Sequence, residues 1–176
     1  MFEADLAEYR EKGAEALKGK LDGLVSRALD ESATENFRHF VADLCMDLKD
    51  YQRALEVLLA NDKAGALTDV GYNNMALCYW ELGREEDAYF AYKKSLAINS
   101  ENVSSLRGAC YLAIEKGHDQ EALDFCRSFY TASPDDREAA IWYATALHNA
   151  DQSQELRQLV ERWEGKFGRD PELEGF

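Results

Sequence analysis

The chain has 176 residues, enough for about one domain with a sizeable hydrophobic core. Its 46% hydrophobic and 31% charged residues are typical of globular proteins, and two prolines are too few for the many turns of an all-β fold. The formal net charge of −14 is spread along the chain, which disfavours nucleic acid and anionic membrane surfaces as partners.

Residues 1–34 form the first predicted segment. Its apolar side chains follow helical spacing, and Asp30 to Ser32 provide a stop signal. The apolar stripe comprises Leu17, Leu21, Leu24, Val25 and Ala28. Two roles are open for this helical segment: it covers the exposed end of the core that follows, or it joins two copies of the chain into a homodimer.

A period of 34 residues dominates the rest of the sequence. The stretch at residues 79–92, YWELGREEDAYFAY, places Gly83 five residues before Ala88, and the same pair recurs at Gly117 and Ala122. An earlier copy has Lys49 in the glycine position and keeps the alanine as Ala54, and a degenerate fourth copy covers residues 146–160. Small side chains in recurring columns allow two antiparallel helices to approach closely, with the glycine in the turn between them.

The repeat resembles the tetratricopeptide repeat family, whose unit is a pair of antiparallel helices with the pattern W-x2-L-G-x2-Y, A-x3-F and P. In the best copy these positions hold Tyr72, Met75, Ala76, Tyr79, Ala88, Tyr92 and Ser100. The resemblance implies an all-α, right-handed superhelical array of three to four helix pairs with helical caps. Its predicted divisions are residues 1–34, three repeats at 35–68, 69–102 and 103–136, and a degenerate repeat with a capping helix at 137–176.

The four cysteines form no CxxC pair, and no run of 18 apolar residues or secretory signal is evident. We therefore expect a cytoplasmic protein without membrane insertion, with Cys45, Cys78, Cys110 and Cys126 as free thiols that serve as small apolar side chains. The sequence shows no phosphate-binding loop, no HExxH and no clustered metal ligands, so no cofactor and no metal are predicted.

In arrays of this family the first helices of successive repeats line a concave groove, and the resemblance places partner binding there. The groove should be lined by residues about a quarter turn around each first helix from the apolar face that packs in the core. Trp80 and Tyr111 are the strongest candidates for contact with a partner, and Gly108 is among the same groove-facing positions. The predicted peptide-binding residues are Asn73, Asn74, Leu77, Trp80, Arg107, Tyr111, Ile114, Ile141 and Trp142. An apolar patch of this kind is typical of a binding surface. Alternatively, neighbouring repeats or the N-terminal segment already cover it.

The predicted function is a non-catalytic protein–protein interaction module, an adaptor, assembly factor or chaperone that binds a peptide or partner helix. Size, charge and layout also resemble the type III secretion chaperones of the family, and an enzyme or enzyme-regulatory subunit is the alternative of another class. No catalytic residues are predicted, because neither Cys126 nor His39 belongs to a Cys–His arrangement. The clamp that grips chaperone C-terminal carboxylates in one subclass is excluded, since an acidic Asp43 stands where that clamp needs an asparagine.

Overall fold

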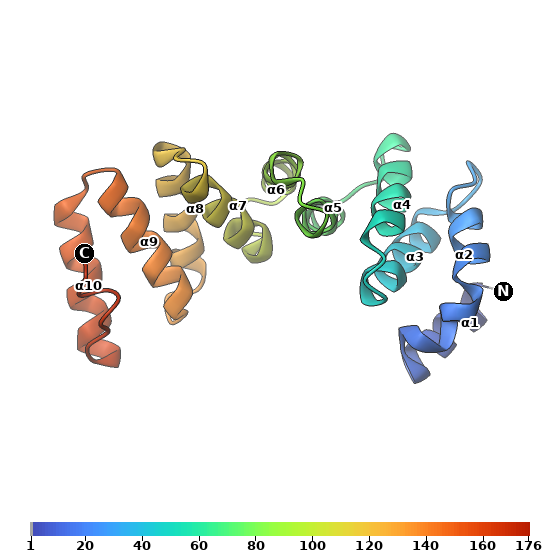
Figure 1. The fold of residues 1–176 in the computed structure, drawn as a ribbon, viewed down its shortest axis with the longest axis horizontal. Helices are drawn as coiled ribbons and strands as arrows, with labels where there is room; N and C mark the ends of the chain where they lie inside the picture. Colours follow the sequence, from blue (N-terminus) through green and yellow to red (C-terminus); the bar gives the residue numbers. More distant parts are fainter. Residues whose placement is uncertain (1) are drawn as a thin grey trace. The chain divides into compact units, whose positions relative to one another are not determined.

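The computed structural model describes residues 2–176, and those residues form helices and turns without any β-strand. The helices, shown in chain order in Figure 1, are α1 (Phe2–Lys12), the 3-10 helix η1 (Ala14–Lys20), α2 (Leu21–Ala28), α3 (Glu35–Asp47), α4 (Tyr51–Lys63), α5 (Asp69–Glu81), α6 (Glu85–Ile98), α7 (Val103–Glu115), α8 (Asp119–Ala132), α9 (Arg137–Asn149) and α10 (Ser153–Phe167). The chain divides into two compact units, the first ending at Ala91 and the second running from Tyr92 to Phe176.

The first helix of every pair begins at a side-chain cap, and the caps recur every 34 residues. The capping residues are Thr34, Thr68, Asn102 and Asp136. In each case a side-chain oxygen accepts a hydrogen bond from a backbone N–H of the first turn, as Asn102 Oδ1 does from Ser105 N at 3.1 Å. Such a cap satisfies a backbone donor that would otherwise lack a partner and typically stabilises a helix by about 1 kcal/mol.

The turn within each helix pair repeats as well. Gly83 has a φ of 71°, and its N–H donates to the Trp80 carbonyl at 2.9 Å while the N–H of Arg84 donates to the Tyr79 carbonyl at 2.8 Å. This pair of bonds is the Schellman motif, which needs a left-handed residue at the end of the helix. The corresponding left-handed residues are Lys49, Gly117 and Asp151. The interpretation of Gly83 as the turn between two helices is therefore correct, and the backbone keeps the same turn where glycine is replaced.

In the first unit, the segment α1–η1–α2 packs against α3 and α4. The rings of Phe2 and Tyr9 lie 5.5 and 5.6 Å from the ring of Phe40, centroid to centroid. Arg38 is buried and donates to the carbonyls of Ala28 at 3.0 Å and Asp30 at 2.9 Å, at the end of α2. The predicted stripe of residues 17–28 is buried throughout. Whether this segment also joins two copies stays a prediction.

The predicted columns of small side chains are buried in both units. The first column comprises Ala42, Ala76, Cys110 and Ala144, and the second Ala54, Ala88, Ala122 and Leu156. None of the first column has any exposed surface, and none of the second is more than 7% exposed. In the second unit, α7 packs on α8, α8 on α9 and α9 on α10, in the antiparallel order that Figure 1 shows. The segment after α10 returns to pack on this unit, with Leu173 only 1% exposed.

The cysteine prediction is wrong for one pair. Cys110 of α7 and Cys126 of α8 are joined in a disulfide, with their Cα atoms 4.9 Å apart. Cys110 stands in the first column, and Cys126 occupies the position that Leu58, Tyr92 and Val160 hold in the other repeats. The close approach of the two helices that favours small side chains therefore also brings the two sulfurs together. Cys45 and Cys78 remain free and buried, as expected, and burial raises the pKa of both thiols to about 12.

Candidate protein-binding surfaces

Four of the predicted groove residues lie on α5 in the first unit. Leu77 is 38% exposed, Trp80 is half-buried, and Asn74 donates its side-chain N–H to Asp43 Oδ1 at 3.3 Å. Asn73 is buried at 8% exposure and offers little surface to a partner. The accessible side chains of this set are therefore Asn74, Leu77 and Trp80.

The N-terminal segment reaches the same face of the first repeat. The Tyr9 hydroxyl donates to Asp47 Oδ2 at 2.6 Å, and burial together with this carboxylate raises the pKa of Tyr9 to about 12. His39, one helical turn before Asp43 on α3, lies 3.3 Å from the buried Asn61 amide and 3.5 Å from Glu35. Helix α1 therefore covers part of the α3 face, which sequence reasoning left as one of two alternatives.

In the second unit, α7 and α9 bring Tyr111 and Trp142 together. Their ring centroids are 5.4 Å apart, and Phe129 of α8 lies 6.1 Å from Trp142. Tyr111 and Trp142 are half-buried, whereas Phe129 is 1% exposed and forms the floor. We call Tyr111, Phe129 and Trp142 the aromatic cluster. Phe129 was not predicted as part of it, because the prediction considered only the first helix of each pair, and Phe129 lies on α8, a second helix.

The neighbours of the aromatic cluster are apolar on one side and acidic on the other. Ile114 and Ile141 are half-buried, and Ile141 and Trp142 line a cleft of about 480 Å³ together with Asp136, Arg137, Glu138 and Glu172. The predicted contact residue Arg107 forms an ion pair with Glu138 across α7 and α9. Arg107 is therefore held by a carboxylate of its own chain at the edge of this surface.

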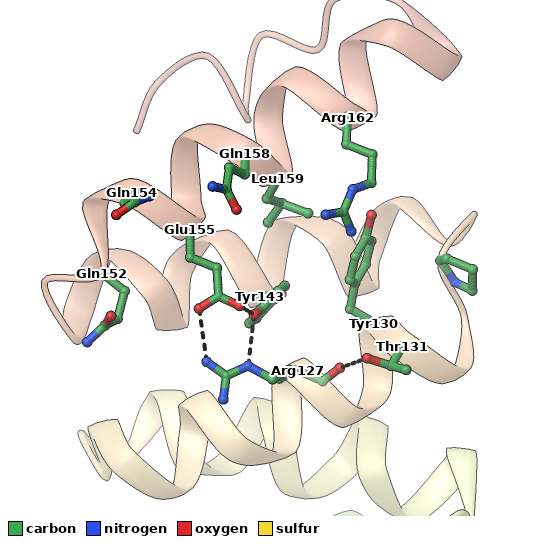
Figure 2. A pocket seen from close by; sticks show the side chains of 11 residues that line it. Arg127, Tyr130, Thr131, Tyr143, Gln152, Gln154, Glu155, Gln158, Leu159 and Arg162 are labelled. Atoms are coloured by element: carbon green, nitrogen blue, oxygen red, sulfur yellow. Dashed lines mark hydrogen bonds and ion pairs between the residues drawn. The ribbon is translucent and has the colours of Figure 1, made fainter.

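A second, larger cleft of about 600 Å³ lies over α8, α9 and α10, and sequence reasoning missed it. One wall is a polar network, visible in Figure 2: Arg127 donates to the Tyr143 hydroxyl at 3.0 Å and to Glu155 Oε2 at 3.1 Å, while Tyr143 donates to Glu155. The hydrogen bond from Tyr143 and those from Arg127 lower the pKa of Glu155, and burial raises the pKa of Tyr143. We call this space the polar cleft.

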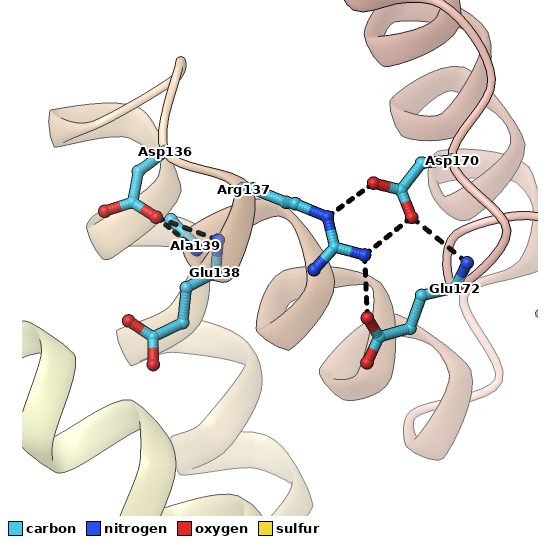
Figure 3. Close-up of polar contacts among 6 residues, drawn as sticks. All are labelled: Asp136, Arg137, Glu138, Ala139, Asp170 and Glu172. Carbon is cyan, nitrogen blue, oxygen red and sulfur yellow. Dashed lines mark hydrogen bonds and ion pairs between the residues drawn. The ribbon is translucent and has the colours of Figure 1, made fainter.

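Arg137, the first residue of α9, binds the segment that follows α10, as Figure 3 shows. Arg137 donates to both carboxylate oxygens of Asp170, at 2.6 and 2.9 Å, and to Glu172 at 2.8 Å. The bidentate hydrogen bond lowers the pKa of Asp170 and raises that of Arg137. Further along, the ring of Phe176 lies 5.8 Å from that of His148 near the end of α9. This segment therefore follows α9 from its first turn to its last.

Groups suited to catalysis or metal binding are sparse in the part of the chain that the structure describes. No three His, Cys, Asp or Glu side chains in residues 2–176 are arranged to hold a metal ion. Cys126, which an enzymatic alternative would use, is in the disulfide, and the two free thiols have raised pKa values that keep them protonated. No helix within those residues is long and apolar enough to cross a bilayer.

Comparison with known proteins identifies the repeat. A family model for the tetratricopeptide repeat (TPR) matches residues 71–102. Over 137 residues, 70% of this chain, the sequence is 34% identical to mouse (Mus musculus) sperm-associated antigen 1. The chain belongs to the TPR family. It spans 14% of the length of the mouse TPR relative, so that protein's activity as a whole does not transfer.

Solved structures show the same TPR fold over almost the whole chain. The crystal structure of YrrB, a TPR protein with an unusual peptide-binding site, superposes with a TM-score of 0.70 at 12% identity, covering 99% of this chain and 96% of YrrB. The MamA protein superposes with a TM-score of 0.68 at 13% identity, covering 97% and 98%. These matches confirm the all-α, TPR-like array. A TPR fold indicates a protein–protein interaction module, and TPR proteins are generally non-catalytic.

Proposed function

We propose that this TPR protein acts as an adaptor, assembly factor or chaperone that binds a peptide or helix of a partner protein. The observation that carries the proposal is the aromatic cluster, where Tyr111 and Trp142 keep part of their rings exposed beside Ile114 and Ile141. Half-exposed aromatic side chains over a buried floor are the usual anchors of protein interfaces. The peptide-binding site of YrrB, which has the same fold, supports this role.

The negative charge around the aromatic cluster indicates which kind of partner segment this surface would bind. The cleft beside Ile141 and Trp142 is lined by three carboxylates, those of Asp136, Glu138 and Glu172, and by one guanidinium, that of Arg137, so acidic groups are in excess there, and the whole chain carries a net charge of −14. Opposite charges on the partner would speed association, and aromatic faces attract cations. A basic or neutral apolar segment is therefore the proposed ligand of this surface. The same negative charge disfavours nucleic acid as a partner. We also propose that the protein is located in the cytoplasm.

On α5 of the first unit, Leu77 and Trp80 form a second contact surface, framed by Asn74. Leu77 and Trp80 stand three residues apart, so they lie on one side of the helix. We assign them the same role as the aromatic cluster, that of apolar anchors for the partner. Asn74 would then orient the partner backbone with the amide hydrogen that Asp43 does not use.

The proposal can be tested with the variant Tyr111→Ala/Ile141→Ala. Partners are recovered from the native cell extract by affinity capture, and the affinity of the purified partner is then measured by calorimetry. The double variant should weaken binding by at least tenfold, about 1.4 kcal/mol, because truncated interface anchors typically cost that much. Its circular dichroism spectrum should match that of the parent chain.

Phe90→Ala provides the matched control. Phe90 is a large apolar side chain with 61% exposure on α6, in the first unit and outside the aromatic cluster, so its removal should leave affinity unchanged. Undiminished affinity of the Tyr111/Ile141 variant for the same partner would refute the assignment of this surface.

A further inference from the structure

The polar cleft contains hydrogen-bonding groups that no part of the described chain uses. Tyr130 is 6% exposed and its ring stacks on Tyr143 with centroids 5.6 Å apart, yet its hydroxyl has no hydrogen-bond partner in residues 2–176. Figure 2 shows this hydroxyl pointing across the cleft towards the guanidinium of Arg162. A tyrosine buried to this extent normally pairs its hydroxyl, so the free hydroxyl at the cleft points to a ligand.

Arg162 of α10 is the second such group. Its guanidinium makes no ion pair or hydrogen bond within the described residues, although its charge helps to lower the pKa of Glu155 and the chain carries 34 acidic side chains. Among the described residues that line the cleft, Glu155 is the one with a carboxylate, and it is already bound by Arg127 and Tyr143. The lining therefore holds two guanidinium groups against one carboxylate, a local excess of positive charge in a strongly acidic protein.

The remaining lining suits an extended chain. Leu159 is 2% exposed and forms an apolar floor, whereas the amides of Gln154 and Gln158 project from α10 without partners in the part of the chain that the structure describes. A glutamine amide both donates and accepts, which matches the backbone N–H and C=O groups of a peptide. The floor and the rim thus offer contacts for peptide atoms on either side of Arg162.

We propose that the polar cleft binds an acidic side chain of an extended segment of a partner protein. Arg162 and the Tyr130 hydroxyl bind the carboxylate, and Gln154 and Gln158 pair with the adjacent backbone. A guanidinium fork and a phenol hydroxyl can together donate three hydrogen bonds to the two oxygens of a carboxylate. This site is distinct from the aromatic cluster, since neither Tyr111 nor Trp142 lines it.

The test uses the full chain and three short peptides, each with a blocked N-terminus. Tetraglutamate amide carries side-chain carboxylates only, tetraglutamine with a free C-terminus carries a terminal carboxylate only, and tetraglutamine amide carries neither. Binding is followed by nuclear magnetic resonance of the Arg162 Nε–H and the glutamine side-chain amides at about 0.15 M salt, where long-range repulsion is screened beyond about 8 Å. Tetraglutamate amide should produce saturable shifts at Gln158 and Arg162, and tetraglutamine amide should not.

Variants distinguish binding at the polar cleft from a general effect of net charge on affinity. Arg162→Gln should weaken tetraglutamate binding at least tenfold, and Tyr130→Phe should weaken it severalfold while leaving the ring in place. Arg157→Gln is the matched control, because it removes the same charge from the same helix at a residue outside the polar cleft, and it should leave the affinity unchanged. Equal weakening by both arginine variants would overturn the proposal, since it would reflect net charge alone.

The other arms give decisive outcomes as well. Tighter binding of the C-terminal carboxylate than of tetraglutamate amide would overturn the assignment to an acidic side chain. If inorganic phosphate shifted the same resonances to saturation at the same concentration, the proposal that the site is specific for carboxylates would be overturned. Neither result would bear on the aromatic cluster, whose test uses other residues and another ligand.

Discussion

Replacing Gly108 by alanine should destabilise the second unit, although alanine is the better helix former. A Cβ atom at position 108 would stand 2.3 Å from Cζ of Tyr92, whereas ordinary van der Waals contacts begin near 3.4 Å. Tyr92 is 4% exposed, so its ring cannot swing out into solvent without leaving a cavity. The ring and α7 must therefore separate by about an ångström.

The magnitude follows from two opposing effects. Overpacking a tight contact costs about 1–3 kcal/mol, and replacing a helical glycine by alanine returns about 0.5–1 kcal/mol. The difference spans about 0–2.5 kcal/mol, and we expect Gly108→Ala to lower the free energy of unfolding by about 1 kcal/mol, near the middle of that range. The control is Gly165→Ala in α10, where no atom lies within 4 Å of the new Cβ and only the gain of about 0.5–1 kcal/mol should be seen.

Urea unfolding followed by circular dichroism gives the measurement, with the midpoint expected to move while the slope stays constant. The double variant Gly108→Ala/Tyr92→Leu tests the cause, since leucine occupies the matching position 58 of the first repeat. If the ring is responsible, Gly108→Ala should cost less in the leucine background, with a coupling energy of about 0.5–3 kcal/mol. Additive effects, or a Gly108→Ala variant as stable as Gly165→Ala, would refute the reasoning.

Three further predictions concern other features. Reduction of the Cys110–Cys126 disulfide, which closes a loop of 16 residues, should lower the free energy of unfolding by about 3 kcal/mol in urea melts, and a double serine variant should not respond to reductant. Because Arg137 lowers the pKa of Asp170, this contact stabilises the packed C-terminal segment above the ordinary carboxyl value of 3.8 and is lost as pH falls through the lowered pKa. Resonances of residues 168–176 should shift in that acidic range in the parent chain, whereas Arg137→Gln should already show the detached values at neutral pH. Arg38→Met should cost about 2–3 kcal/mol in the same melts, since it removes two buried hydrogen bonds to backbone carbonyls, and a loss below about 0.5 kcal/mol would contradict this account.

The fold was accessible from the sequence because its determinants are local and recur at one period. Gly83 and Ala88 mark a left-handed turn and a close helix contact, and both requirements act within one helix pair. Lys49 adopts the same left-handed conformation as the glycines, so the turn is kept in the first repeat although the glycine is missing. The capping column beginning at Thr34 was an equally regular signal, a polar residue every 34 positions, and reading it would have placed the first helix of each pair to the residue.

The disulfide was missed for a different reason. Cys110 was assigned to a column of small side chains and Cys126 was expected to be a small apolar side chain, and both are buried, but the two positions were considered one at a time. The close packing of the two antiparallel helices also places the two sulfurs within bonding reach, as the Cα separation of 4.9 Å shows. A search for a 34-residue period compares equivalent positions in different repeats. It does not compare two positions that face each other within one helix pair, and the disulfide joins two such positions.

The surface predictions depended on neighbours that periodicity does not specify. A quarter-turn rule places Gly108 on the groove, but the ring of Tyr92 covers it, and the same rule selects Asn73, which the structure buries. The proposed contact residues therefore stay predictions. The exposure and contacts of a side chain distinguish an accessible residue such as Tyr111 from covered residues such as Gly108 and Asn73, and periodicity does not. The polar cleft could not be anticipated at all, because Arg162 and Tyr130 come from different helices and share no motif.

Two consecutive residues of α9 show how this scaffold separates its surfaces. Trp142 meets Phe129, and Tyr143 meets Tyr130, so neighbouring side chains of α9 pair with neighbouring side chains of α8. Successive side chains point about 100° apart on a helix, so the first pair lies in the aromatic cluster and the second beside the polar cleft. Substitutions that spare these four rings can therefore alter one surface without repacking the other. A partner that is lost with Tyr111→Ala/Ile141→Ala but kept with Arg162→Gln would occupy the first surface alone, and the reverse pattern would assign it to the second.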